Sequence, residues 1–352
     1  MKHYIIPIFI PHYGCTHSCI FCNQQKITGR DTPVRLQEVV TIINEHLTGI
    51  TEKRYIEVAF YGGSFTALPL ERQSQLLESA HKALMNGRIH SIRLSTRPDC
   101  ITQEIVENLV NYGVSTVELG VQSLDNKVLQ ASARGHSSLD VFQAVSIIKK
   151  MNLKCGLQLM PGLPLEDWRS LIHTAYNVIK LVPDFVRIYP TLVIADTRLA
   201  NLYQKGHYKA LSLTAGIVRG AFLKLMFEHH GIPTIRTGLQ ATEELDKGNV
   251  VLAGPYHPAF GEMVDSYVFY IMLAHWAESI LFSHQTDDII IHHHPRDTSK
   301  IRGIYNENIK KIKKNYGITN LILIPDGVII DELVFEFKNL SYVINKKMIF
   351  YI

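Results

Sequence analysis

The sequence predicts an α/β protein in which a partial parallel (β/α)6 barrel is followed by a smaller C-terminal α/β domain. Three observations favour this fold class. From about residue 5 to residue 236, six short β-branched runs alternate with segments of helical period, as in parallel strands joined by crossover helices. Six such units, rather than eight, indicate an open barrel. The regular alternation of strand and helix patterns ends after residue 236, so we expect domains at 1–236 and 237–352.

The elements of the first domain are predicted from local pattern. The strand candidates are 5–10, 56–61, 91–95, 116–120, 154–159 and 186–189. Helices are expected between them; Thr102 is a candidate N-cap for a helix that Gly113 ends, and Ser137 or Ser138 for the next one. In a parallel barrel the functional groups lie in the loops that follow the strands, so these loops are the places to search.

The second domain is predicted with a different order of elements. A long helix at 264–282, a strand at 289–293, a basic helix at 303–316 and a strand at 320–324 are expected. Asp265, His275 and Glu278 interrupt the long apolar helix, which favours a buried amphipathic helix over a membrane span. The apolar run at the start of the chain is broken by Pro7 and Pro11, unlike a secretion signal. We therefore expect a cytoplasmic protein that does not bind membranes.

The composition is that of a globular protein. Of its 352 residues, 46% are hydrophobic and 19% are charged, with a formal net charge of +4. This charge is too small to indicate a nucleic-acid partner by itself, although it does not oppose an anionic one. In the reducing cytoplasm, clustered cysteines bind metal more often than they form disulfides.

Three of the five cysteines lie together in the loop after the first predicted strand, as Cys15, Cys19 and Cys22. A structural zinc site normally takes four protein ligands, and no fourth cysteine lies beside these three. Three thiolates suit a 4Fe–4S cluster in which one iron keeps an open position for another molecule. A zinc site completed by His12 or His17, or reactive thiols without metal, are the alternatives that the spacing leaves open.

Other residues near the strand ends are less specific. Cys100 and Cys155 are far from the cluster and are expected to be ordinary small buried residues. The turn "FYGGSFTALP" follows the second predicted strand, where Gly62 and Gly63 let the backbone approach a ligand and Ser64 adds a hydroxyl. Glycines at a strand end usually make only a turn, so this feature needs further support.

That support comes from a family resemblance. The CxxxCxΦC spacing resembles the signature of the radical S-adenosylmethionine (SAM) superfamily. The motifs "GGSFTALP", "LSTRPD", "VELGVQSLDNKVLQASARGH", "LQLMPGLP" and "VRIYPTLVIADTRLANLYQKGHYKAL" resemble, in the same order, the radical SAM region of the catalytic subunit of the Elongator tRNA-modifying complex. A more distant likeness runs to oxygen-independent coproporphyrinogen oxidase. The resemblance covers about residues 5–210.

The resemblance implies two cofactors and their ligands. Cys15, Cys19 and Cys22 would hold a 4Fe–4S cluster, whose electron cleaves SAM reductively into methionine and a 5′-deoxyadenosyl radical. The residues implied in binding SAM are Gly62, Gly63, Ser64, Ser95, Arg97, Gln122, Arg134 and Gln158.

Individual roles follow from the family positions. The glycine turn would receive the methionine amino group, while Gln122, Arg134 and Gln158 would hold the ribose, the carboxylate and the adenine of SAM. Ser95 is a departure, because relatives commonly place an acidic ribose ligand there. The Thr96 hydroxyl or Arg97 is expected to compensate for the weaker serine.

The resemblance also bears on the reaction. It implies a reductant such as a flavodoxin or ferredoxin, and a possible tRNA substrate. The residues after 236 contain no glycine-rich acetyl-CoA loop of the Elongator kind, so the uridine-carboxymethylating reaction is not carried over. The acceptor of the radical stays open between a tRNA nucleoside and a small molecule such as a tetrapyrrole. The alternative of another class is a non-catalytic zinc-binding protein.

Two further stretches could bind ligands. In "IIIHHHPRD", His292 and His294 share one face of the predicted strand and, with Asp297 nearby, could ligate a metal; an exposed polar strand end is the simpler interpretation.

The second stretch is the basic helix at 303–316. Its lysines, together with the aromatic Tyr305 and Tyr316, could follow a phosphate backbone, or could be only a solvated helix face over a buried side made by Ile304, Ile309 and Ile312. The lysines are Lys310, Lys311, Lys313 and Lys314.

Overall fold

The chain folds into two compact units. The computed structural model describes residues 2–10, 17–23, 34–50, 52–240, 243–246, 250–280, 288–337 and 340–349. The first unit is Met1–Leu211 with Gln240–Gly254, and the second is Ser212–Leu239 with Pro255–Ile352. This division differs from the predicted boundary at 236–237. The reason is that helix α9 (Leu213–His229) contributes Ala221 and Leu225 to the hydrophobic core of the second unit.

The first unit contains the six predicted strands. They are β1 (Lys2–Ile10), β2 (Arg54–Gly62), β3 (Ser91–Thr96), β4 (Val114–Gln122), β5 (Lys154–Leu159) and β6 (Phe185–Ile188). These strands lie in that order in one sheet, and each neighbouring pair is parallel. The predicted α/β fold with a partial parallel barrel is therefore confirmed.

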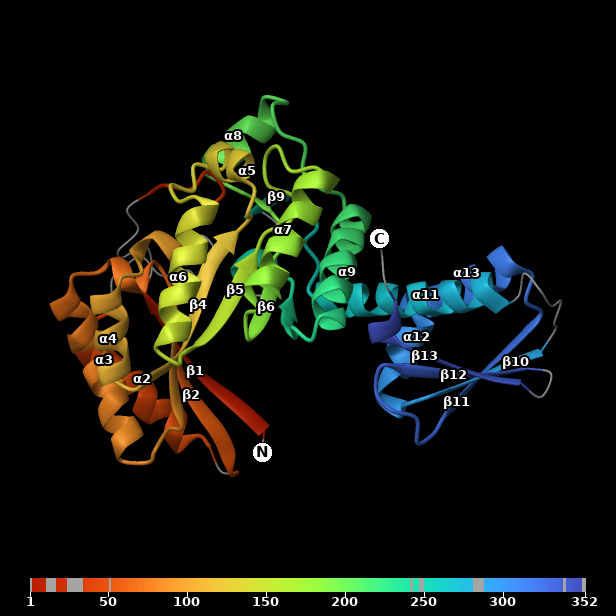
Figure 1. The fold of residues 1–352 in the computed structure, drawn as a ribbon, viewed down its shortest axis with the longest axis horizontal. Coiled ribbons are helices and arrows are strands. Elements are labelled where there is room, and N and C mark those ends of the chain that lie inside the picture. The colour runs from red at the N-terminus through yellow and green to blue at the C-terminus, as the bar shows by residue number, and fades with distance from the viewer. Residues whose placement is uncertain are drawn as a thin grey trace. The chain divides into compact units, whose positions relative to one another are not determined.

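Helices cover one face of this sheet (Figure 1). They are α2 (Leu36–Thr48), α3 (Leu70–Met85), α4 (Gln103–Asn111), α6 (Ser138–Lys150) and α7 (Trp168–Leu181). The short helix α5 (Asn126–Ala131) follows β4 and lies beside α8 in the view of Figure 1. The caps are as the sequence predicts, because Thr102 accepts a hydrogen bond from the Ile105 amide and Ser137 forms a capping box with Asp140. The N-cap side chains therefore fix where helices α4 and α6 begin.

Shorter elements complete the first unit. They are α8 (Arg198–Gln204), α10 (Glu243–Asp246), the 3-10 turns Phe65–Ala67 and Pro98–Cys100, and the antiparallel pair β7 (Val193–Ile194) and β9 (Val251–Ala253).

The second unit places helices against a four-stranded sheet. The helices are α9, α11 (Phe260–Ile280), α12 (Thr298–Arg302) and α13 (Glu307–Tyr316), and the strands of the sheet are β10 (Asp288–His293), β11 (Asn320–Pro325), β12 (Glu332–Phe337) and β13 (Leu340–Asn345). The short strand β8 (Thr234–Thr237) follows α9 and is not part of this sheet. The four-stranded sheet has the order β11-β10-β12-β13. In its core, Trp276 stacks on Phe335 with ring centroids 4.3 Å apart.

Two predictions for the second unit need correction. The long helix begins at Phe260 rather than 264. The basic segment is not one helix, because Tyr305 and Asn306 in the turn Ile304–Asn306 have left-handed φ angles of 52° and 62°, so α13 begins only at Glu307. Ile304, expected on the buried side, is 44% exposed. Within the described ranges, no helix has the length and apolarity needed to cross a bilayer.

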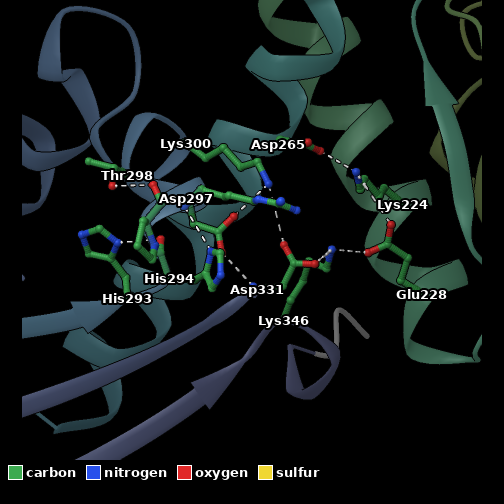
Figure 2. Close-up of polar contacts among 12 residues, drawn as sticks. Lys224, Glu228, Asp265, His293, His294, Asp297, Thr298, Lys300, Asp331 and Lys346 are labelled. Carbon is green, nitrogen blue, oxygen red and sulfur yellow. Dashed lines mark hydrogen bonds and ion pairs between the residues drawn. The ribbon is translucent and has the colours of Figure 1, made fainter. Parts of the chain in front are cut away.

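A network of ion pairs ties the helices of the second unit to its strands (Figure 2). The Lys346 ammonium contacts Glu228 of α9 at 2.6 Å and Asp331, next to β12, at 2.8 Å. Asp297 is fully buried; it accepts from the Lys300 ammonium at 2.9 Å and from the Asp331 amide at 2.8 Å. Opposite charges therefore compensate one another inside this unit, which limits the cost of burying them.

Candidate functional site

The cysteine loop is anchored by the residue between its cysteines. Ile20 is 3% exposed; its amide donates to the Ser132 carbonyl, and its carbonyl accepts from the Leu199 amide. Cys19 and Cys22 form one turn, in which the Cys22 amide donates to the Cys19 carbonyl at 3.2 Å. Cys15 and His12 lie outside the described residues. Ile20 is thus an apolar anchor that fixes Cys19 and Cys22 within the loop between β1 and α2.

Two arginines point at the Cys19 sulfur. The Arg134 Nη1 lies 3.1 Å from Cys19 Sγ, while its Nη2 donates to the Gly120 carbonyl at 2.6 Å. The Arg97 Nη1 lies 4.0 Å from the same sulfur, and its Nη2 pairs with Asp99 at 2.9 Å. Both arginines are buried: Arg97 is 2% exposed and Arg134 is 7% exposed. Cys19 therefore lies in a positively charged environment at the carboxyl ends of β3 and β4.

His136 is a buried neighbour of these arginines and is uncharged at neutral pH. Its Nε2 lies 3.2 Å from the Val121 carbonyl oxygen, and its Nδ1 lies 3.9 Å from Asp99. Burial, together with the charges of Arg134 and Arg97, lowers the pKa of His136 to about 3. At neutral pH this histidine consequently adds no charge to the site.

The glycine turn after β2 has the conformation that requires glycine. Gly62 has a φ of 109°, and a Cβ there would lie 2.9 Å from the Ile10 carbonyl oxygen. The Gly63 amide donates to that same oxygen at 2.7 Å, which ties the turn to the end of β1. Ser64 is 1% exposed and precedes the 3-10 turn Phe65–Ala67. The close approach of two backbone segments therefore explains Gly62 without a ligand.

The two glutamines are brought together by an irregularity in β4. The pairing of β4 with β5 shifts register between Gly120 and Gln122, and Gln122 has a φ of 68°. Its Oε1 accepts from Gln158 Nε2 at 3.3 Å. The bulge thus turns Gln122 toward the neighbouring strand, so that both amides lie at the same edge as Arg134.

Ser95 and Thr96 lie on opposite faces of β3, because side chains alternate along a strand. Ser95 is half-buried on the face that carries Arg93, and Thr96 is 4% exposed on the other face. The Thr96 hydroxyl lies 2.6 Å from the Thr66 hydroxyl and accepts from the Thr66 amide. Thr96 is therefore engaged in a structural contact with Thr66.

A charged network on one face of the sheet was missed by the sequence analysis. Arg93 pairs with Glu57 at 2.8 Å and with Glu118 at 2.8 Å, and Glu118 also forms an ion pair with Arg187, whose Nε lies 2.9 Å from the carboxylate. The two carboxylates are 3% and 4% exposed. A signal existed, since strands of a parallel sheet are usually apolar throughout, whereas β3 reads Ser91, Arg93, Ser95 at every second position.

Two tyrosines extend this network to the edge of the sheet. Arg187 Nη2 donates to the Tyr61 hydroxyl and Nη1 to the Tyr189 hydroxyl, each at 3.2 Å. Tyr61 directly precedes Gly62, and Tyr189 directly follows β6. Burial, with a further contribution from the Glu118 charge, raises the pKa of Tyr61, while the Arg187 charge opposes this in part. Tyr61 therefore keeps its proton at neutral pH.

The histidine cluster of the second unit divides between different partners. His292 lies 2.6 Å from Asp326 and 3.3 Å from Glu336, whereas Asp297 binds Lys300. His293 is fully buried on the opposite face. In the part of the chain that the structure describes, no group of three His, Cys, Asp or Glu side chains is arranged to hold a metal.

The basic helix presents most of its lysines to solvent. Lys310, Lys311 and Lys314 are exposed, and Ile309 and Ile312 form the buried side, as predicted. Lys311 pairs with Glu307 at 2.9 Å in an exposed ion pair.

The two aromatic residues near this helix differ. Tyr305 is 90% exposed, whereas the Tyr316 hydroxyl donates to Glu278 at 2.8 Å. Tyr305 is therefore the aromatic side chain that this surface offers to a partner.

The chain is similar in sequence to known proteins. Residues 9–175 match the Radical SAM superfamily, and residues 183–269 match the Radical SAM C-terminal domain. A tRNA uridine(34) acetyltransferase of Methanocaldococcus infernus is 32% identical over 174 residues, which are 44% of this chain and 33% of that protein. Elongator complex protein 3 of Saccharomyces cerevisiae is 32% identical over 181 residues, covering 46% and 32%.

A solved structure is similar in fold. The archaeal Elp3 of Methanocaldococcus infernus, with an N-terminal deletion, superposes with a TM-score of 0.60 at 23% identity and covers 76% of this chain and 63% of that one. The sequence match spans only about a third of the two curated relatives. The predicted resemblance to the Elongator subunit is thus confirmed over the shared region.

Proposed function

The chain belongs to the radical SAM superfamily and is an enzyme, and we propose that it binds a 4Fe–4S cluster and SAM and acts on a tRNA nucleoside. The observation that carries the proposal is the convergence of two arginines on Cys19 beside the glycine turn and the glutamine pair. When bound, the cluster supplies an electron and SAM supplies the adenosyl group for the family's radical chemistry.

The donor set fits both cofactors. Three cysteines, Cys15, Cys19 and Cys22, would each supply one thiolate and leave one iron for the methionine part of SAM. Arg97 and Arg134 have buried Nε atoms for which no hydrogen-bond partner exists among the described residues. A buried guanidinium with an unused donor suits an anionic ligand, which for SAM is its carboxylate.

The remaining contacts are proposed from position. The backbone at Gly62 and Gly63 would bind the methionine amino group, with Ser64 beside it. Gln122 would bind the ribose and Gln158 the adenine, since an amide both donates and accepts.

Ser95 lies on the same face of β3 as Arg93. Its hydroxyl would form a weaker hydrogen bond with the ribose than a carboxylate does. We propose that Arg97, which forms a hydrogen bond with Asp99, compensates for the weaker contact between Ser95 and the ribose.

Two observations favour a tRNA substrate. One relative is a tRNA uridine(34) acetyltransferase, although the chain spans a third of it. The exposed lysines of α13 and the solvent-facing Tyr305 offer charge for phosphates and a ring for stacking. A flavodoxin or ferredoxin would supply the electron.

The cluster assignment is tested with single cysteine variants. Cys15→Ala, Cys19→Ala and Cys22→Ala should each lose most iron and sulfide after anaerobic reconstitution, and should form no 5′-deoxyadenosine when reduced with SAM. Cys155→Ala is the control, because Cys155 is fully buried and burial raises its pKa to about 12. A loop variant with full iron content and full SAM cleavage would refute the assignment.

The tRNA part is tested by binding at several salt concentrations. Replacing Lys310, Lys311, Lys313 and Lys314 with Gln should weaken tRNA binding and flatten its salt dependence by up to about 3 to 4 in log–log slope. The control replaces four exposed lysines of the first unit, Lys82, Lys127, Lys150 and Lys180, with the same loss of charge. If the unchanged protein binds no tRNA at low ionic strength, a small-molecule acceptor replaces the tRNA proposal.

A further inference from the structure

The edge of the charged network in the first unit has the features of a binding site for the acceptor. Phe9, Tyr61, Arg187 and Tyr189 are all half-buried, whereas Glu57, Arg93 and Glu118 beneath them are buried. The residues of the strands lie on one face of the sheet, since Phe9 pairs with Tyr61 and the register continues across the strands. Tyr189 directly follows β6 and is joined to this group by the hydrogen bond from Arg187. The half-buried groups are thus the part of the network that a ligand can reach.

The hydrogen-bond directions leave donors for a ligand. Arg187 holds Glu118 through Nε and the two tyrosine oxygens through Nη1 and Nη2. A phenolic oxygen that accepts from a guanidinium keeps its own proton and can donate it elsewhere. Tyr61 and Tyr189 therefore offer two O–H donors whose positions one planar guanidinium fixes.

The charge balance says what kind of group these donors suit. Arg93 and Arg187 are matched by Glu57 and Glu118, so the four charges of the cluster cancel. A phosphate or carboxylate bound here would find no uncompensated positive charge within the cluster. Neutral carbonyl oxygens need only the hydroxyl donors that the site provides.

The aromatic rings add a second feature. The rings of Phe9 and Tyr61 lie with centroids 6.3 Å apart, and Arg187 lies over the Tyr61 ring at 5.5 Å. Unstacked bases are commonly bound by stacking on aromatic rings or guanidinium planes together with hydrogen bonds to their edges. The edge of this network combines both kinds of contact.

We propose that Tyr61 and Tyr189, positioned by Arg187, bind the acceptor as a planar, uncharged ring that presents carbonyl oxygens, as a pyrimidine base such as uracil does. This inference rests on the proposed function and names the groups that would receive the base at that site. Glu118 acts through Arg187 as a positioning residue.

The test compares tyrosine-to-phenylalanine variants of the reconstituted, reduced holoenzyme. For each protein the ratio of 5′-deoxyadenosine formed with tRNA to that formed without it is measured over a range of tRNA concentrations. Tyr61→Phe and Tyr189→Phe keep the ring and remove the hydroxyl. Each should lower this ratio about five- to tenfold, as expected for the loss of one hydrogen bond of about 1 kcal/mol or slightly more. The double variant should lower it further.

Two further variants make the result specific. Tyr55→Phe removes a hydroxyl from the same strand, at a residue that is 40% exposed and contacts His3 and His90, so it should leave the ratio unchanged. Arg187→Lys keeps the charge but loses the planar fork, and should lower the ratio as the tyrosine variants do.

The outcomes separate the two proposals. No 5′-deoxyadenosine from wild-type enzyme would refute the radical SAM reaction itself. SAM cleavage that tRNA does not stimulate in the wild type would overturn the base-binding site. Stimulation of the double tyrosine variant within twofold of wild type would overturn this inference alone.

Discussion

The first and the second unit each contain a buried network of acidic and basic side chains, and the two networks differ in their cations. In the first unit the cations are Arg93 and Arg187; in the second they are Lys224, Lys300 and Lys346. Each lysine is held by carboxylates from other helices, turns or strands, whereas Arg187 holds one carboxylate and two tyrosine hydroxyls.

The difference shows how side-chain geometry separates a structural network from one that can serve a site. An ammonium is a compact charge, and in Figure 2 the lysines join acidic residues to one another. A guanidinium spreads its donors in a plane, so Arg187 can be neutralised on one side and still orient hydroxyl groups on the other. The network of the first unit therefore includes tyrosine hydroxyl donors at its edge, whereas in the second unit the lysines and carboxylates pair with one another.

The largest expected effect is at Glu118, which both arginines share. Glu118→Ala leaves Arg93 and Arg187 with only Glu57 for charge balance in a buried place. Removing one partner of a buried ion pair costs about 3 to 5 kcal/mol, so the free energy of unfolding in urea should fall by that amount. Glu118→Gln, which keeps the shape, should lose less; a loss below about 1 kcal/mol for Glu118→Ala would contradict the account.

The corresponding residue of the second network is Asp297. Asp297→Asn keeps the shape but weakens the contacts with the Lys300 ammonium and the Asp331 amide. Hydrogen bonds to charged groups contribute about 1.5 to 3 kcal/mol, so we expect a loss of about 2 kcal/mol in the free energy of unfolding. SAM cleavage should not change. A fall in SAM cleavage in a protein that is still folded would mean that this network is more than structural.

His136 should give the first unit a characteristic pH dependence. Its folded pKa of about 3 lies below the ordinary 6.5, because of burial and of Arg134 and Arg97, with Asp99 opposing in part. As the pH falls, His136 is therefore protonated in the unfolded chain before it is protonated in the folded protein. The free energy of unfolding consequently decreases as the pH drops below 6.5. Between pH 6.5 and 5 the loss should be about 2 kcal/mol. Urea unfolding of wild type and His136→Gln at both pH values measures it; equal losses would contradict the assignment.

The smallest expected effect is the pH dependence of stability due to His292 in the second unit, which has the opposite sign to that of His136. Burial lowers the pKa of His292, but the hydrogen bonds to Asp326 and Glu336 outweigh it and raise the pKa above its ordinary value. This contribution is present below pH 6.5 and is lost as the pH rises through the folded pKa. His292→Gln should therefore cost more stability at pH 6 than at pH 8.5, by less than about 1 kcal/mol for a partly exposed pair. A larger cost at pH 8.5 would contradict the pairing.

Much of the fold could be predicted because the first unit is locally consistent. The six strands were visible as β-branched runs, and Thr102 and Ser137 cap helices as their sequence context suggests. The basic segment after Gly303 was harder. Its helical period continues through Tyr305 and Asn306, and only their left-handed conformation in the folded chain shows that α13 begins at Glu307.

The candidate site was predicted in part. The sequence singled out Cys19, Arg134 and Gln122, and the structure brings Arg134 within 3.1 Å of the Cys19 sulfur. It could not show that Thr96, whose hydroxyl contacts Thr66, lies on the opposite face of the strand from Ser95. Alternation along the strand decides this, and it depends on which face the sheet turns toward the helices.

By itself the sequence determined the order of strands and helices, the cysteine spacing and the glycine turn, because each depends on residues close together in the chain. Only the tertiary structure decided which charges meet. Glu57, Arg93, Glu118 and Arg187 come from four strands, and only the parallel register places them on one face. A charged side chain within a predicted strand can face solvent or a buried partner, and local sequence does not distinguish the two, since the partner lies tens of residues away.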